Sequence, residues 1–154
     1  MLTIALALGV WVTSTAKNPM DDSDRFAATA VSSDSHMRMT VFCRIEPDRA
    51  IDPQYEPWLH VQINVTAIFD YDSEDHGTVQ FRFDRDPLIT KPGRVRAGTR
   101  DTVVFAHERG RELVQMFKGK RTLFVNPDLY SKVFIESFDV SSFPFDFFPA
   151  PCLQ

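Results

Sequence analysis

Glycine, cysteine and long apolar runs are scarce in this chain, and each scarcity narrows the range of functions. The six glycines form no Gly-rich phosphate loop and no Gly-x-Ser-x-Gly nucleophile motif. The two cysteines lack Cys-x-x-Cys spacing, so the sequence does not indicate a zinc site or a redox dithiol. No segment approaches the ~20 apolar residues that a membrane-spanning helix needs, so we expect no stable membrane insertion. These scarcities favour a binding function over nucleotide or metal chemistry.

Apolar side chains, by contrast, are plentiful enough for a substantial core. Hydrophobic residues make up 44% of the 154 residues, and 14 of these are phenylalanine. A chain of this length is typical of one domain. We therefore expect a single β-sandwich domain over residues 9–154, preceded by an apolar start over residues 1–8.

The clearest structural signal is strict alternation of apolar and polar residues. It runs through residues 37–46 and again through residues 59–67. Period-two alternation predicts strands with one buried and one wet face. The apolar positions of the first strand are Met37, Met39, Val41, Cys43 and Ile45.

Shorter β-patterned segments occur along the rest of the chain, and regular βαβ alternation is missing. This order predicts a mainly β protein, specifically an antiparallel β-sandwich with one short α-helix. We expect a proline-bounded connection over 85–92, and no helix in the proline-rich tail over 141–154. The further strands are expected at 9–15, 25–31 (paired with 37–46 as a hairpin), 78–84, 94–97, 102–105, 121–126 and 131–140, and the helix at 107–117.

The apolar start has two interpretations. Ala5-Leu6-Ala7 fits a signal-peptidase site, but the run is short and no basic segment precedes it. Residues 1–8 are therefore either the remnant of a signal peptide or a first strand. The strand would place Leu2, Ile4, Leu6 and Leu8 on one face.

Cys43 and Cys152 are either bridged, in an oxidising compartment, or two free thiols, in a reducing one. We favour the bridge. It would close a loop of about 100 residues, worth ~4.7 kcal/mol in the chain-entropy model. It would also fasten the tail to the strand at 37–46. Two Cα atoms more than ~7 Å apart would contradict this prediction.

Charge is unevenly distributed. The formal net charge is −4, which argues against a nucleic-acid partner. Nine bases but only three acids lie between Lys91 and Arg121. This region is either a solvated patch or a docking surface for an anionic partner. The docking interpretation would use Arg94, Arg96, Arg109 and Arg111.

The tail contains four phenylalanines in a proline-rich segment, namely Phe143, Phe145, Phe147 and Phe148. They would form either a lid over the edge of the core or an aromatic contact surface for another protein.

Catalytic and metal-binding patterns are weak. The acidic turn over residues 70–77 lacks the Gly and Glu positions of a calcium-binding EF-hand loop. The four histidines have neither His-x-x-x-His spacing nor a paired acidic motif. We therefore predict no catalytic residue, no metal site and no cofactor.

Several segments, taken in order, resemble the small exported proteins associated with type VI secretion systems, of the TagO or VasI type. The resemblance covers most of residues 9–152. It rests on a tryptophan strand, a Pro-x-Asp-Asp-Ser loop, a cysteine strand, an Arg-Phe-Asp strand and a late Phe-Asp strand. These are residues 9–15, 18–23, 41–44, 79–84 and 133–140, with Cys152 last. The chain departs from the family in its Pro- and Phe-rich tail and its long 47–57 loop.

The resemblance implies export, a Cys43–Cys152 bridge and no enzymatic activity. We therefore expect a non-catalytic accessory or binding protein of a cell-envelope assembly, exported to the periplasm, with an envelope protein as its partner. One alternative is a phage or prophage virion or surface protein of the same fold. Another is an envelope hydrolase or metal-dependent enzyme, which would show clustered acidic and histidine side chains in a cleft.

Overall fold

The computed structural model describes residues 9–49, 52, 54–70, 76–130 and 132–154. The apolar start over residues 1–8, predicted as a signal remnant or a strand, lies outside this part of the chain. So does most of the acidic turn at 70–77, of which His76 and Gly77 belong to a strand.

Nine strands and two short α-helices make up the described structure, with one 3₁₀ turn. In chain order they are β1 (Val12–Lys17), β2 (Asp24–Val31), β3 (Met37–Ile45), β4 (Trp58–Val65), β5 (His76–Phe83), β6 (Ile89–Val95), β7 (Thr102–Ala106), α1 (Glu108–Gln115), β8 (Thr122–Pro127), β9 (Glu136–Asp139), η1 (Phe145–Phe147) and α2 (Ala150–Leu153).

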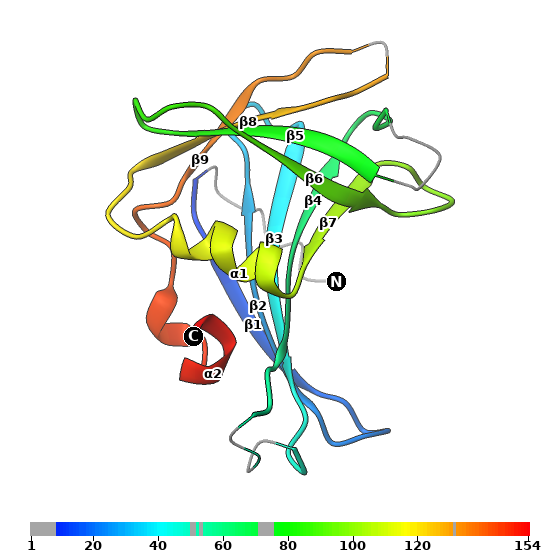
Figure 1. Ribbon diagram of the computed structural model, residues 1–154, viewed down its shortest axis with the longest axis vertical. Coiled ribbons are helices and arrows are strands. Elements are labelled where there is room, and N and C mark those ends of the chain that lie inside the picture. Colours follow the sequence, from blue (N-terminus) through cyan, green and yellow to red (C-terminus); the bar gives the residue numbers. More distant parts are fainter. Residues whose placement is uncertain (1–8, 50–51, 53, 71–75, 131) are drawn as a thin grey trace, which may run out of the picture.

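All nine strands belong to one antiparallel sheet, in the order β1-β2-β3-β4-β7-β6-β5-β8-β9. The mainly β, antiparallel fold class is thus confirmed. A sandwich of two separate sheets is not confirmed, because hydrogen bonds connect every described strand to the next. The sheet is instead strongly bent, so that β5, β6 and β8 run across the direction of β3 and β4 (Figure 1).

The predicted alternation produces the buried face of β3 and β4. Met39, Val41 and Cys43 are fully buried, as are Val61 and Ile63 directly across from them. The intervening side chains face away from the core. The predicted β2–β3 hairpin is also present, with Val31 opposite Arg38.

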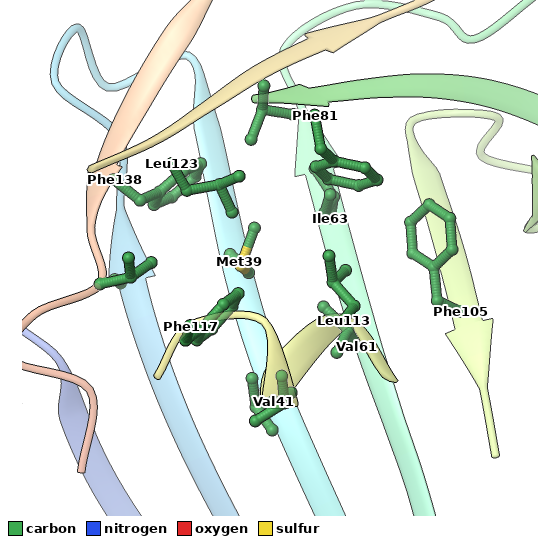
Figure 2. Packing of buried hydrophobic residues seen from close by; sticks show 14 of the residues in the cluster. Met39, Val41, Val61, Ile63, Phe81, Phe105, Leu113, Phe117, Leu123 and Phe138 are labelled. Atoms are coloured by element: carbon green, nitrogen blue, oxygen red, sulfur yellow. The ribbon is translucent and has the colours of Figure 1, made fainter. Parts of the chain in front are cut away.

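The core lies inside the bend of the sheet. Met39 and Ile63 face Phe81 and Leu123 from the other arm, and Phe117 packs in the same cluster (Figure 2). Burial of apolar surface is the main contribution to the stability of such a fold, at roughly 25 cal/mol per Å².

Helix α1 closes the open side of the bend, over β4 and β7 (Figure 1). Its apolar residues Leu113 and Val114, together with Phe117 just after it, are buried against the sheet. Gly110 allows the helix to approach the strand closely, because an added Cβ would lie 2.5 Å from the Phe105 carbonyl oxygen. Gly119 follows the helix with a φ of +73°, a conformation that favours glycine.

The connection predicted over residues 85–92 is partly wrong, because β6 already begins at Ile89 and contains Pro92. Proline lacks the N–H group that a central strand position needs. β6 pairs with β7 only at Arg94 and Val95. At Pro92, β6 therefore has a neighbouring strand on one side only, namely β5, and proline is tolerated there as it is in an edge strand.

The tail prediction is also wrong in one respect, because Ala150–Leu153 forms the short helix α2. Pro151 lies in its first turn, where a missing N–H costs no intrahelical hydrogen bond. The last predicted strand is shorter than expected: β9 covers Glu136–Asp139 of the predicted 131–140, and residue 131 lies outside the described structure.

Candidate functional site

The predicted disulfide joins β3 to α2. The Cα atoms of Cys43 and Cys152 lie 6.1 Å apart and their sulfurs 2.13 Å apart. Both residues are fully buried. The bridge prediction is confirmed, and the tail is covalently fastened to β3, an interior strand of the sheet.

The tail phenylalanines pack mainly inward. Phe143 and Phe148 are each only 5% exposed and stack on one another at 5.7 Å. Phe143 also meets Trp11 edge to face at 4.9 Å. These two rings therefore belong to the lid over the core, and neither is available as the predicted aromatic contact surface. Phe145 and Phe147 are half-buried around them.

The four arginines of the predicted docking surface have different roles. The side chain of Arg111 is only 13% exposed and faces Glu56. Its guanidinium donates to the carbonyl oxygens of Cys152 and Pro57. Arg111 therefore fastens the tail and is removed from the docking surface by these contacts.

The other three arginines remain exposed. Arg109, on α1, donates to the carbonyl oxygen of Pro92 at 3.4 Å. Arg94 and Arg96 alternate along the chain with the buried residues Gly93 and Val95. The two arginines therefore project from the far face of the sheet, the one turned away from the core.

That far face, which we call the outer face, is the side of β3, β4, β7 and β6 turned away from α1 (Figure 1). It carries an aromatic cluster that sequence analysis did not identify. Phe42 and His60 are direct cross-strand partners and stack at 4.8 Å. Trp58 lies 5.4 Å from His107 and is 49% exposed.

A hydrogen-bonded polar row adjoins this cluster. Arg96 donates to the side-chain oxygen of Gln62 at 3.1 Å, and the Gln62 amide donates to Asn64 at 3.0 Å. Asn64 in turn donates to Thr102, whose hydroxyl donates to Asp101. The row is thus fixed in position by its own contacts.

A polar groove of about 400 Å³ lies beside this row, at the end of the β3–β4 pair that carries Asn64. Its lining includes Arg38, Thr40, Gln62 and Asn64. Arg38 is exposed and lies opposite Asn64 in the β3–β4 register. The groove and the aromatic cluster together form a continuous run of side chains along β3 and β4.

The electrostatics of the outer face favour a neutral His60. Burial lowers the pKa of His60 below its ordinary value of 6.5, and the positive charges of Arg96 and His107 lower it further. Within the described residues, its buried Nδ1 has no hydrogen-bond partner. A neutral ring stacked on Phe42 is an apolar surface rather than a cation.

One buried polar cluster lies elsewhere, between the β2–β3 turn and β9. The Glu136 carboxylate, 2% exposed, lies 2.9 Å from Nδ1 of His36 and accepts a 2.6 Å hydrogen bond from Ser32. Ser32 donates to the Glu136 carboxylate and not to the His36 imidazole. The serine–histidine–acid chain of a catalytic triad is therefore not present in this cluster. The cluster connects two distant segments of the sheet.

In the described part of the chain, no group of three or more His, Cys, Asp and Glu side chains is arranged to hold a metal ion. Over those same residues, no helix has the length and apolar character to cross a membrane.

The outer-face cluster did have a sequence signal. Phe42 is a large apolar residue at a solvent-facing position of an alternating strand, and Trp58 has the same phase as the polar positions 60, 62 and 64. An aromatic residue on the wet face of a strand is a candidate binding residue.

Comparisons with protein-family models, with curated proteins and with solved structures found no match.

Proposed function

We propose that this chain is an exported, non-catalytic binding protein of the cell envelope, an accessory to an envelope assembly such as a type VI secretion system. The observation that carries the proposal is the buried Cys43–Cys152 bridge. Disulfides persist in oxidising compartments and are rare where thiols are kept reduced. The periplasm is the oxidising compartment that the family resemblance implies.

Contacts between the segments that carry the resemblance support the proposal. Asp21 of the Pro-x-Asp-Asp-Ser loop pairs with Arg44 of the cysteine strand at 2.5 Å. Trp11 of the tryptophan strand donates to the carbonyl oxygen of Asp139 in the late Phe-Asp strand at 2.7 Å. Asp84 of the Arg-Phe-Asp strand accepts from the backbone of Thr122. Each of these residues connects its motif to a distant segment of the fold. A shared role in holding the fold together would explain why the motifs occur in the same chain.

The outer face supports a binding role. It presents an exposed indole, exposed guanidinium groups and half-buried amides on a rigid sheet, and such preorganised groups bind with little loss of side-chain entropy. Binding by this face would not require any chemical change in the ligand, in agreement with a non-catalytic role.

Cell fractionation with redox-sensitive mass measurement tests the proposal. The protein, expressed from its own gene with a C-terminal tag in the native host, is recovered separately from cytoplasm, periplasm and membranes. Thiols are trapped by alkylation at lysis. We expect the mature protein outside the cytoplasm, with a non-reduced peptide joining Cys43 to Cys152.

A Cys43→Ala/Cys152→Ala variant controls for the assignment of the linked peptide, which it cannot form. Recovery of the wild type in the cytoplasm with two alkylated thiols would overturn the proposal.

A further inference from the structure

The exposed Trp58 is the largest accessible ring of the outer face. Phe42 and His60 cover one another by stacking and are half-buried, whereas Trp58 remains 49% exposed. An indole is broad and apolar on its faces, and its quadrupole attracts the polarised C–H groups of a sugar ring. A single open indole beside polar groups suits a ligand with one apolar and several polar faces.

The polar row provides those hydrogen-bonding groups in a fixed geometry. Gln62 and Asn64 are planar amides, each with an oxygen acceptor and two N–H donors. Arg96 is a planar guanidinium with five donors, one of which meets Gln62. Paired donors and acceptors of this kind match neighbouring hydroxyl groups and carboxylates.

The charge of the outer face indicates which polar ligands it favours. Arg38, Arg94 and Arg96 are exposed on this face, although the chain as a whole carries a net charge of −4. Within the hydrogen-bonded row the acidic member is Asp101, which is engaged by Thr102. The outer face is therefore complementary to an anion, in contrast to the rest of the molecule.

We propose that the outer face binds an acidic glycan strand, with Trp58 stacked on a sugar ring and the row from Gln62 to Arg96, together with Arg38, holding hydroxyls and carboxylates. The inference rests on the proposed function, because an envelope location would place such glycans beside the protein. At ~3.3 Å per residue, the distance along β4 from Trp58 to Asn64 is ~20 Å, long enough for several sugar units.

Single-stranded nucleic acid is the competing ligand for an aromatic and basic sheet. Such sites stack successive bases on successive exposed rings along a positively charged channel. The outer face has one widely exposed ring, since Phe42 and His60 stack on each other. This arrangement favours the glycan.

Equilibrium binding to defined polymers tests the inference. The purified, bridged chain is titrated with polygalacturonate as the acidic glycan, dextran as the neutral glycan and a 20-mer of deoxythymidine. We expect saturable binding to polygalacturonate that weakens as salt rises, because exposed charges are screened. We expect no measurable binding to dextran and weaker binding to the oligonucleotide.

Matched variants locate the site. Trp58→Ala and Arg96→Gln should each weaken polygalacturonate binding about ten-fold, equivalent to about 1.4 kcal/mol. Tyr130→Ala removes an aromatic ring that is 69% exposed elsewhere, and Lys132→Gln removes an exposed charge beside it. Both controls should bind as the wild type does, and circular dichroism should show all four variants folded.

Tighter binding to the oligonucleotide, equal binding to dextran, no binding to polygalacturonate, or unchanged binding by folded Trp58→Ala would each overturn the inference. Fractionation and the linked peptide test export separately. A bridged, exported protein that ignores acidic glycans would therefore refute this inference alone.

Discussion

The indole nitrogen of Trp11 donates a 2.7 Å hydrogen bond to the carbonyl oxygen of Asp139, 128 residues further along the chain. Trp11 immediately precedes β1, the first strand of the sheet order, and Asp139 ends β9, the last. The bend of the sheet thus brings its two edges together at this bond. Trp11 is 8% exposed whereas Asp139 is an exposed residue, so the bond lies at the boundary between the core and water.

Replacing Trp11 with phenylalanine should remove the donor and leave the Asp139 carbonyl without this partner. Because Asp139 is exposed, water can replace the indole as its partner, and we expect the free energy of unfolding to fall by roughly 0.5–1.5 kcal/mol, the net value of an ordinary hydrogen bond. Urea denaturation followed by circular dichroism measures the change. Trp58→Phe is the matched control, because Trp58 is exposed, and its stability should change by less than ~0.5 kcal/mol. Equal losses in the two variants would show that the bond contributes nothing specific.

The bridge should contribute to stability mainly through the unfolded chain. In Cys43→Ala/Cys152→Ala the tail is no longer tied to β3, and we expect a loss of roughly 2–5 kcal/mol in the free energy of unfolding. The same denaturation series on reduced wild-type protein separates the bridge from side-chain packing, because both sulfurs are retained. Reduced wild type as stable as the bridged form would contradict the prediction.

Local sequence pattern predicted the local structure well and the pairing of distant strands poorly. Alternation at Met37–Ile45 identified β3 and its buried face, because a half-buried strand needs that period. The pairing of β4 with β7 depends on how the whole chain folds, and no short pattern encodes it. Pro92 was misleading for the same reason, since its tolerance depends on which neighbours β6 has at that point.

The candidate site was predicted only in part. The cysteine pair was predicted from residue type and is confirmed, whereas the docking role predicted for Arg94 and Arg96 from charge stays a prediction, with both residues exposed. The role of Arg111 was not, because its partners Pro57 and Cys152 are distant in sequence. Phe42 and Trp58 each carry a local signal, an aromatic side chain on the wet face of a strand, but only the β3–β4 register brings them into one cluster.

Gly110→Ala should destabilise the protein although alanine is the better helix former. The added Cβ would lie 2.5 Å from the Phe105 carbonyl oxygen of β7 and 3.3 Å from the His60 Cα of β4, so α1 would have to move away from both strands. Overpacking of this kind costs typically 1–3 kcal/mol, more than the ~1 kcal/mol gained in helix propensity. Thermal unfolding measures the net effect. Glu108→Ala, at an exposed position of the same helix, is the control and should leave the midpoint nearly unchanged.

The stability of the fold should depend on pH through His60. Its pKa is lowered in the folded state by burial and then by the positive charges of Arg96 and His107. The unfolded chain, with a pKa near 6.5, therefore binds more protons than the folded protein as the pH falls below that value. Stability from this group is fully present above pH 6.5 and is lost as the pH falls toward the folded pKa.

His60→Gln should flatten this dependence, because the variant has no proton to bind at this position. The measurement is the free energy of unfolding of both proteins at intervals from about pH 8 to pH 5. The two curves should run parallel above about pH 7 and diverge below ~6.5, with the wild type falling more steeply. Because carboxylates contribute equally to both curves, only their difference reports on His60. Parallel curves throughout would show that the imidazole is protonated as easily in the folded protein as in the unfolded chain.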